Sequence, residues 1–353
     1  MPGEAALGAE GVPAGDAVLD MVALLRRGRR SGTSGPGPAS GVGASLVQAV
    51  RARRAQDVLG VSPYPWPMPI DFSSPEAVAA LAREDVARAL AEDVGAGDLT
   101  AALVPAGRRL RARILAREAA VVCGAPWVEA AVRALDASAT LRWQVAEGAR
   151  CVADTVVVHI EGEARALLSA ERTALNFLQL LSAVATKTAR HVAEVAGTRA
   201  QIVDTRKTLP GLRLAQKYAV RMGGGTNHRI GLFDAVLIKE NHIAAAGGVR
   251  PVLAAALAVA PQAAFVEIEV ETLAQLAEAL DAGARMILLD NMDLATLTEA
   301  VRLNAGRAVL EISGGVTLER LRALASTGVD RISIGTLTKD VQAIDYSMRF
   351  EDL

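Results

Sequence analysis

The feature that most constrains the fold is an alternation of short apolar runs and helical stretches from about residue 175 onward. The apolar runs are rich in Val and Ile, as buried strands are, and they lie at 200–204, 235–239, 264–270, 285–290, 308–312 and 330–334. Stretches with a helical spacing of Leu and Ala separate several of them, at 273–280, 294–303 and 318–325. At least six strand–helix units in series predict a parallel α/β sheet that closes, or nearly closes, into a barrel. We place this barrel domain at 175–340.

Residues 67–174 have the pattern of a small α+β domain. Ser74-Pro75 predicts a helix start, because Ser caps a helix and Pro is tolerated at its first position. Apolar residues then recur with a helical period as far as Leu90. The segments 110–122, 141–146 and 153–160 alternate or run apolar, as strands do.

Residues 1–66 differ from the rest of the chain in composition. No aromatic residue precedes Tyr64, and Gly, Ala, Ser and Pro dominate. Such a stretch buries too little apolar area to offset its ordering entropy, so we expect a disordered extension. Two alternatives stay open: a cationic docking arm, or a wrongly assigned start site in a protein that begins near Met68.

Composition excludes several kinds of partner. The net charge of −1 gives no general electrostatic reason to bind nucleic acid or an acidic membrane surface. No apolar run is long enough to span a bilayer, and no signal peptide is recognisable. The two cysteines, Cys123 and Cys151, form neither a disulfide framework nor a metal-ligand set, which favours small core residues in a reducing cytoplasm.

Each predicted barrel strand ends in polar residues that a buried strand would not otherwise carry. These residues are Asp204 to Thr208, Lys239 to His242, Glu267 with Glu269 and Glu271, Asp290-Asn291, Ser313-Gly314-Gly315, and Gly335-Thr336. Any one group alone has an ordinary explanation, such as a solvated turn, a rim ion pair or an outward strand face. In parallel α/β folds, however, the carboxyl ends of the strands meet at one rim, where sites are built. The pattern therefore predicts one site at that rim.

The residue types at this rim suit a phosphorylated sugar together with a small carboxylate. The basic residues suit a small polyanion, since arginine binds planar carboxylates through paired hydrogen bonds; they are Arg206, Lys207, His228, Arg229 and Lys239. Glu269 and Asp290 suit ribose hydroxyls or Mg²⁺. The two glycine turns, at Ser313 and Gly335, offer backbone N–H groups to a phosphate.

The run from Lys217 to Arg229 contains three consecutive glycines followed by His228-Arg229. Bare glycine backbone can approach an anion closely, so the run favours an anion pocket. A metal site built on His228 and His242 is not expected, because no cysteine lies near them and no second pair of ligands completes the set.

In their order along the chain, these segments resemble the signature of the quinolinate phosphoribosyltransferase family. The matching segments are Glu92–Thr100, Thr205–Arg213, Lys217–Arg229, Leu237–His242, Glu267–Glu271, Leu289–Met292 and Ser313–Gly315. The resemblance implies an α/β fold in which an N-terminal α+β sandwich domain precedes an open or incomplete parallel α/β barrel. We expect residues 341–353 to pack on the N-terminal domain.

The resemblance also implies an activity. The family transfers phosphoribosyl from phosphoribosyl pyrophosphate to quinolinate with decarboxylation, uses Mg²⁺, and forms homodimers in which one subunit's N-terminal domain covers the other's barrel mouth. The implied catalytic residues are Lys207, Lys239, Glu269 and Asp290, of which Glu269 and Asp290 also hold the metal. The implied substrate-binding residues are these four with Thr205, Arg206, His228, Arg229, Ser313, Gly314, Gly315, Ile334, Gly335 and Thr336, and with Arg172 from the partner subunit.

Three alternatives remain at this point. Two are related enzymes on the same fold, a nicotinate phosphoribosyltransferase or a molybdenum-cluster-associated homologue. The third is a non-catalytic barrel that binds a phosphosugar, which would not need Glu269 and Asp290 beside a cationic pocket. The full set of basic residues from Arg206 to Arg229 favours a dicarboxylate over a monocarboxylate.

Overall fold

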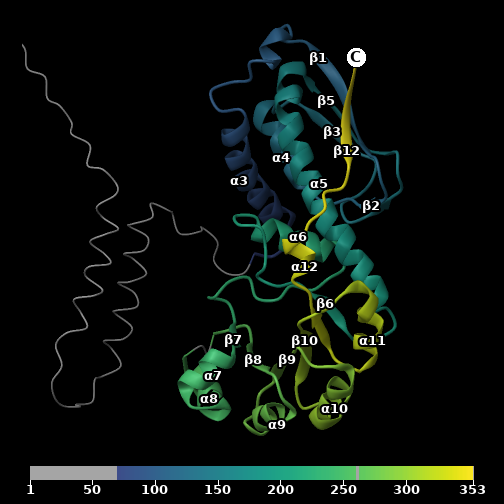
Figure 1. Ribbon diagram of the computed structural model, residues 1–353. Helices are drawn as coiled ribbons and strands as arrows, with labels where there is room; N and C mark the ends of the chain where they lie inside the picture. Colours follow the sequence, from purple (N-terminus) through teal and green to yellow (C-terminus); the bar gives the residue numbers. More distant parts are fainter. Residues whose placement is uncertain (1–69, 260–261, 353) are drawn as a thin grey trace, which may run out of the picture. The chain divides into compact units, whose positions relative to one another are not determined.

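A computed structural model describes residues 70–259 and 262–352 (Figure 1). The extension predicted at 1–66 and the alternative start near Met68 lie outside the described residues. None of the described helices combines the length and apolar character needed to cross a membrane.

The first part of the described chain is an antiparallel sheet covered by helices. Its strands are β1 (Arg109–Ala116), β3 (Thr140–Trp143), β5 (Thr155–Glu163) and β12 (Tyr346–Asp352), in the order β12-β1-β5-β3. Three helices accompany it: α3 (Pro75–Asp93), α4 (Ala125–Leu135) and α5 (Ala164–Glu194). A 3-10 turn (η1, Ala101–Leu103) and a two-stranded ladder of β2 (Ala120–Val121) and β4 (Arg150–Cys151) complete this part.

Local sequence signals explain how these elements begin and pack. The predicted cap is present, since the Ser74 side chain accepts a hydrogen bond from the Ala77 N–H at the start of α3. Cys123 and Cys151 are free and buried, as expected.

The last strand pairs along β1 from Tyr346 to Asp352, which places the chain's C-terminal segment in the first sheet.

The helix α5 runs through the boundary predicted at 174/175. It is 31 residues long and buries side chains along its whole length, from Ala164 to His191. The next helix, α6 (Arg213–Met222), also packs in the first core, where Tyr218 meets Trp127 of α4. Residues beyond 174 therefore complete the N-terminal core before the barrel strands begin.

The second part is a parallel sheet of six strands. They are β6 (Gln201–Val203), β7 (Val236–Ile238), β8 (Val266–Val270), β9 (Met286–Asp290), β10 (Val309–Ser313) and β11 (Arg331–Ser333). The sheet order is β6-β11-β10-β9-β8-β7, and the end strands β6 and β7 are not paired with each other. The predicted open α/β barrel is confirmed.

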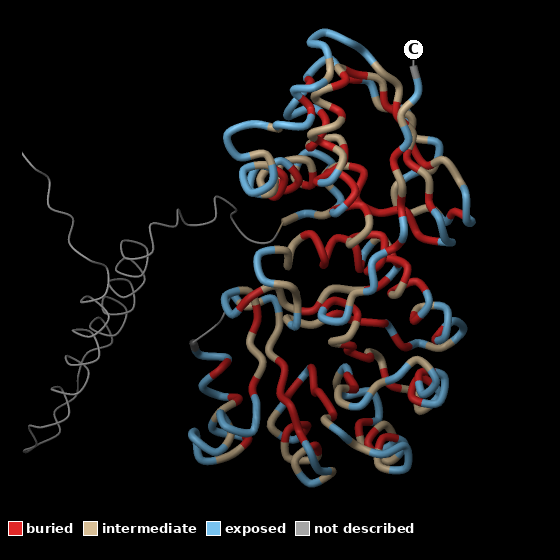
Figure 2. The backbone as a smooth tube through the Cα atoms, turned by 45° about the horizontal axis from the view of Figure 1, so that its top comes forward, coloured by how far each residue is buried: buried red, intermediate tan, exposed pale blue. Residues whose placement is uncertain are grey.

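Helices cover the outer face of this sheet (Figure 1). They are α7 (Glu240–Ala246), α8 (Val249–Val259), α9 (Leu273–Asp281), α10 (Leu294–Asn304) and α11 (Leu321–Ser326), with a 3-10 turn at Leu318–Arg320. The short helix α12 (Thr336–Lys339) instead contacts α5 and α6. The outward strand residues, such as Ile268, Ile287 and Ile332, are buried against the outer helices in a second core. Figure 2 shows the sheet strands as largely buried segments and the distal turns between them as exposed.

Candidate active site

The inner face of the barrel sheet carries a belt of charged side chains. Side chains alternate along a strand, and residues paired across parallel strands point to the same side. Glu269 pairs with Leu288, and Leu288 pairs with Glu311, which in turn pairs with Arg331. The residues two positions further on, Asp290 and Ser313, form the next row and pair with each other. The face opposite the apolar core thus collects these polar groups around the barrel mouth, by which we mean the carboxyl ends of β6 to β11.

The predicted cations and carboxylates meet at this mouth. Lys239 Nζ lies 2.7 Å from Glu269 Oε2. Burial, followed by the neighbouring charge of Arg206, lowers the pKa of Arg229. Burial raises the pKa of Glu267, and the positive charges of Arg229 and Lys239 both lower it. Glu267 lies two residues before Glu269 on β8. Lys239 thus pairs directly with Glu269, and Arg229 is joined to Glu267 through the His228 ring. Arg206 is near enough to Arg229 for its charge to be felt there.

Asp290 is held by its neighbour at the end of β9. The Asn291 side chain donates a hydrogen bond to Asp290 Oδ2 at 2.8 Å, and the Asn291 N–H donates to the Ser313 carbonyl. A Cβ on Gly314 would lie 2.0 Å from Asn291 Oδ1, so glycine is required there for Asn291 to fit. The sequence did not distinguish Asn291 from other polar rim residues, because its part is to orient Asp290.

Lys207 lies against the last turn of the barrel. A Cβ on Gly335 would lie 2.8 Å from Lys207 Cδ and 3.5 Å from Thr205 Oγ1. The Thr338 hydroxyl donates to the Lys207 carbonyl at 2.7 Å. Thr205, Lys207 and the Gly335-Thr336 turn are thus neighbours, as predicted for residues of one site.

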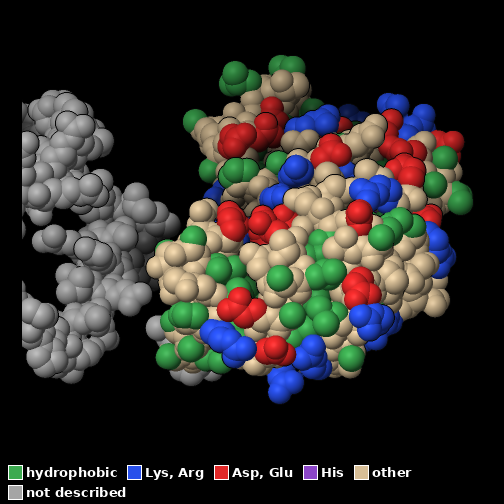
Figure 3. Space-filling view, turned by 60° about the horizontal axis from the view of Figure 1, so that its bottom comes forward, with side chains coloured by type: hydrophobic (Ala, Val, Ile, Leu, Met, Phe, Trp, Pro, Cys, Tyr) green, Lys and Arg blue, Asp and Glu red, His purple; other side chains and the backbone are tan. Residues whose placement is uncertain are grey.

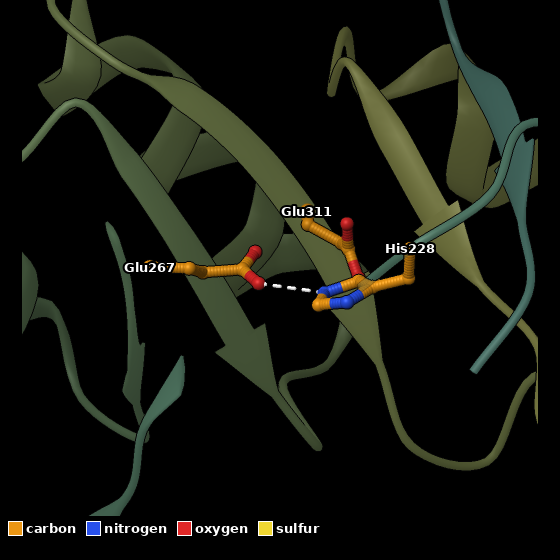
Figure 4. Close-up of side chains that lie close together, drawn as sticks. All are labelled: His228, Glu267 and Glu311. Carbon is orange, nitrogen blue, oxygen red and sulfur yellow. Dashed lines mark hydrogen bonds and ion pairs between the residues drawn. The ribbon is translucent and has the colours of Figure 1, made fainter. Parts of the chain in front are cut away.

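His228 differs from its expected form as a cation that faces substrate. It is buried, with 7% of its surface exposed, and both ring nitrogens are bonded within the chain. Nε2 lies 2.8 Å from Glu267 Oε2, and Nδ1 accepts a hydrogen bond from the Arg229 N–H at 2.8 Å (Figure 4). An accepting Nδ1 carries no proton, so the ring is neutral. Burial likewise lowers the pKa of His228.

Two buried charges beneath His228 were not predicted from the sequence. Glu311 on β10 lies 3.7 Å from His228 Nε2, and Arg331 Nε donates to Glu311 Oε2 at 2.8 Å. Burial raises the pKa of both Glu267 and Glu311 to about 7. In the sequence, these residues are marked only as a single charge within each apolar strand, as in Val309-Leu-Glu-Ile-Ser313.

Two further predictions need correction. The three glycines at 223–225 form no anion pocket, because their N–H groups bond to the end of α6 and a Cβ on Gly223 would lie 2.4 Å from the Ala185 carbonyl on α5. Ile334 is a core residue with 2% exposure, and its N–H is bonded to the Val203 carbonyl. A buried residue of this kind, directly after β11, offers a substrate neither its side chain nor its N–H.

The end of β6 and the segment before Arg229 are pinned by a fully buried ion pair. Lys217 Nζ contacts Asp204 Oδ1 and donates to the His228 carbonyl at 3.0 Å. Asp204 also accepts from the Asn227 side chain and from the His228 N–H, at 2.7 and 2.8 Å. This network fixes the backbone that carries His228 and Arg229.

Arg172, which we expected to act from a partner subunit, lies exposed on α5. Near it, Leu99 and Leu103 are 89% and 83% exposed around η1, which contacts α5. On the face in Figure 3, basic and acidic side chains are interspersed with apolar ones, so this face offers no large patch of one charge sign.

Comparison with known proteins gives a consistent result. The family model described as "Quinolinate phosphoribosyl transferase, N-terminal domain" matches residues 98–182, and its C-terminal counterpart matches 184–349. The chain is 43% identical to the nicotinate-nucleotide pyrophosphorylase (carboxylating) of Mycobacterium leprae, over 76% of this chain and 96% of that one. A probable enzyme of the same name from Bacillus subtilis is 40% identical, over 73% and 89%. The solved nicotinate-nucleotide pyrophosphorylase of Francisella tularensis matches with a TM-score of 0.75 and 40% identity, over 77% and 97%.

Proposed function

The chain belongs to the quinolinate phosphoribosyltransferase family, and from this membership we propose how the residues of its barrel mouth share the reaction. The enzyme transfers the phosphoribosyl group of phosphoribosyl pyrophosphate to quinolinate with decarboxylation. The products are nicotinate mononucleotide, CO₂ and pyrophosphate, a step of NAD biosynthesis. The observation that carries the assignment of residues is the meeting of Arg206, Arg229 and Lys239 around the carboxylates of β8.

The quinolinate dianion binds to these cations. Arg206 and Arg229 suit its carboxylates, because a guanidinium can donate two parallel hydrogen bonds to one carboxylate. Burial is the main cause of the lowered pKa of Arg229, and repulsion by the neighbouring Arg206 guanidinium lowers it further. A bound dianion relieves that repulsion, which favours a dicarboxylate over the monocarboxylate nicotinate.

The ribose ring and its metal lie at the carboxylate pair. Glu269 and Asp290 come from neighbouring strands and belong to the inner face, and carboxylate oxygens are the ligands that Mg²⁺ prefers. These two residues would hold Mg²⁺ that arrives with phosphoribosyl pyrophosphate, where it would offset the charge of the leaving pyrophosphate. The same carboxylates stabilise positive charge that develops on the sugar ring.

The 5′-phosphate binds to the turns that follow β10 and β11. Ser313, Gly314 and Gly315 lie at one strand end and Gly335-Thr336 at the next. Lys207 lies against Gly335 and supplies a charge to the same turn. Backbone N–H groups at such turns are a common phosphate site in α/β barrels.

Chemistry at this mouth needs positioning and charge but no covalent intermediate with the protein. The bond from ribose C1 to pyrophosphate breaks, and the lone pair of the pyridine nitrogen forms the new bond to C1. The ring nitrogen is then positively charged, so it stabilises the electron pair left on the adjacent carbon when its carboxylate departs as CO₂. That carbon finally takes up a proton.

Arg172 completes the site from a second copy of the chain. It is exposed on α5 beside the exposed Leu99 and Leu103, which would be covered where the N-terminal domain meets a partner's barrel mouth. The free, buried state of Cys123 and Cys151 suits a cytoplasmic enzyme.

One assay tests the substrate assignment against its alternatives. The chain is incubated with phosphoribosyl pyrophosphate and Mg²⁺, and with either quinolinate or nicotinate. We expect CO₂ and mononucleotide from quinolinate and little product from nicotinate. Product from nicotinate alone would indicate the related monocarboxylate enzyme, and no product from either would indicate a binding barrel.

A further inference from the structure

The buried cluster of His228, Glu267 and Glu311 lies just beneath the proposed quinolinate site (Figure 4). The potential ligand atoms of these three residues lie within 4.8 Å of one another. Glu267 and Glu311 have no exposed surface. Among the described residues, the Oε1 atom of each has no hydrogen-bond partner. An arrangement of this kind is costly to bury, so it invites a functional explanation.

The hydrogen bonds of His228 decide its protonation. The backbone N–H of Arg229 can only donate, so His228 Nδ1 must be the acceptor. A neutral imidazole has one N–H, which is then on Nε2, where it points at Glu267 Oε2 2.8 Å away. His228 is thus held as the Nε2–H tautomer, with Glu267 as its acceptor.

This tautomer argues against a metal site in the cluster. A metal bonds to a nitrogen lone pair, and Nε2 has none while it carries the proton. Arg331 also donates to Glu311 at 2.8 Å, so a cation is already present beside the two carboxylates. The geometry fits a role in orienting neighbouring groups better than a role as a ligand set.

We infer that Glu267 is a positioning residue for Arg229, acting through the His228 ring. The hydrogen bond to His228 is the one side-chain hydrogen bond of Glu267 in the described part of the chain. The ring in turn binds the N–H of Arg229. The chain Glu267–His228–Arg229 fixes the backbone from which the Arg229 guanidinium reaches the quinolinate carboxylates, so this inference rests on the proposed role of Arg229.

Neighbouring contacts show that the Arg229 backbone is anchored from both sides. The Asp234 carboxylate accepts from the N–H groups of Ile230 and Gly231, at 2.6 and 2.9 Å. Before Arg229, the buried Asp204 holds the N–H of His228. Between these two anchors, the His228 ring binds the Arg229 N–H and so fixes the backbone from which the side chain extends. The guanidinium itself donates to the Ala235 carbonyl at 3.4 Å.

The first experiment measures the tautomer without any assay of activity. Long-range ¹H–¹⁵N spectra of the full chain resolve the ring nitrogens of its four histidines, and His228→Asn assigns the signals of His228. We expect a neutral ring protonated on Nε2 between pH 6 and 8. An imidazolium, or a ring protonated on Nδ1, would overturn the inference.

The second experiment separates the hydrogen bond from the charge. In Glu267→Gln the amide oxygen can still accept from Nε2–H, so we expect the KM for quinolinate to stay within about threefold of the wild type. Glu267→Met keeps similar bulk but has no comparable acceptor, and we expect that KM to rise roughly tenfold or more, because a displaced binding group is costly. The KM for phosphoribosyl pyrophosphate should hardly change in either variant.

A matched control is Glu299→Met, on the outer helix α10, where the side chain is 43% exposed; this variant should behave as the wild type. Equal KM values in Glu267→Met and the wild type, or equal losses in the Gln and Met variants, would contradict the inference. If Glu267→Met does not fold, the spectrum of the wild-type chain still decides. A normal quinolinate KM in Arg229→Ala would instead remove the proposed role of Arg229, and would leave the tautomer unaffected.

Discussion

Position along a strand gives identical side chains different chemistry in this protein. Glu267, Glu269 and Glu271 alternate at the same spacing. Glu267 is fully buried and hydrogen-bonds His228, Glu269 is 9% exposed and pairs with Lys239, and Glu271 is exposed. Depth within the barrel therefore separates a positioning carboxylate, a carboxylate of the mouth and a surface charge.

The basic residues after β6 should be essential for turnover. Arg206→Ala or Lys207→Ala removes one preorganised charge, and loss of such a group typically lowers the rate by about 10²–10³. Steady-state kinetics with quinolinate measures the loss, and circular dichroism checks that the variants stay folded. Arg250→Ala, an exposed change on α8, is the control. Near-normal activity in both site variants would remove these residues from the mechanism.

Substitution of Gly314 should lower activity because of a steric clash, and Gly306, which has a similar backbone conformation without that clash, is the control. Gly314 and Gly306 both have a positive φ, 90° and 77°, so alanine strains the backbone at either position. Only at Gly314 would the new Cβ collide, 2.0 Å from Asn291 Oδ1, whereas nothing lies within 4 Å at Gly306. We expect kcat/KM for phosphoribosyl pyrophosphate to fall at least about tenfold in Gly314→Ala, and to be unchanged in Gly306→Ala. Similar kinetics in both variants would mean that Asn291 does not orient Asp290.

At the scale of elements, the sequence was most informative about the strands and their order. All six barrel strands lie within, or one residue beyond, the predicted apolar runs, because a strand buried against helices must be apolar on that face. The charges inside the barrel, Glu311 and Arg331, were missed. Their significance depends on pairing across β10 and β11, which no local pattern reveals.

The sequence also could not predict the roles of residues that depend on tertiary packing. Gly223 and Gly225 are needed where the end of α6 crosses α5, a contact between segments far apart in the chain, and Gly224 between them has a positive φ. His228 is neutral because it is buried and because its Nδ1 accepts a hydrogen bond from the Arg229 N–H. In both cases the residue type suggested anion binding, and tertiary contacts decided otherwise.

Loss of one partner from the buried ion pair of Lys217 and Asp204 should destabilise the fold strongly. Lys217→Met would leave Asp204 buried without its cation, which typically costs about 3–5 kcal/mol. Chemical denaturation measures the unfolding free energy. Arg302→Met, which removes an exposed pair with Glu299, is expected to have no measurable effect. A small effect of Lys217→Met would mean that Asp204 is stabilised by its other hydrogen bonds.

At the scale of the whole molecule, the proposed sharing of Arg172 predicts complementation. Arg172→Ala and Lys207→Ala homodimers should each be nearly inactive. If subunits exchange at random, half of the dimers are mixed and each mixed dimer has one intact site, so about a quarter of wild-type activity should return. The two proteins are mixed under conditions of subunit exchange and assayed with quinolinate. No recovery, despite exchange shown by labelled subunits, would place Arg172 outside the site.

The buried acids should also make the stability of the molecule depend on pH. Burial, followed by the charge of Glu267, raises the pKa of Glu311 from 4.5 to about 7. An acid whose pKa is raised in the folded state contributes most stability below pH 4.5 and loses that contribution as the pH rises to 7. The unfolding free energy of the wild type should therefore fall relative to that of Glu311→Gln over this range, by up to roughly 3 kcal/mol.

Denaturant titrations at several pH values measure this difference. Glu271→Gln, which changes an exposed carboxylate directly after β8, should follow the wild type. Parallel curves for the wild type and Glu311→Gln would show that Glu311 does not titrate in this range.

The pairing of β12 with β1 has a consequence for biosynthesis. A ribosome delivers β1, β3 and β5 early, but residues 346–352, which pair with β1 along its length, are synthesised only after all six barrel strands. Until then Ile344, Tyr346 and Met348 cannot fill their places in the first core. A nascent chain halted before β12 would thus keep one edge of its earliest sheet open to chaperones, although all six barrel strands had already been synthesised.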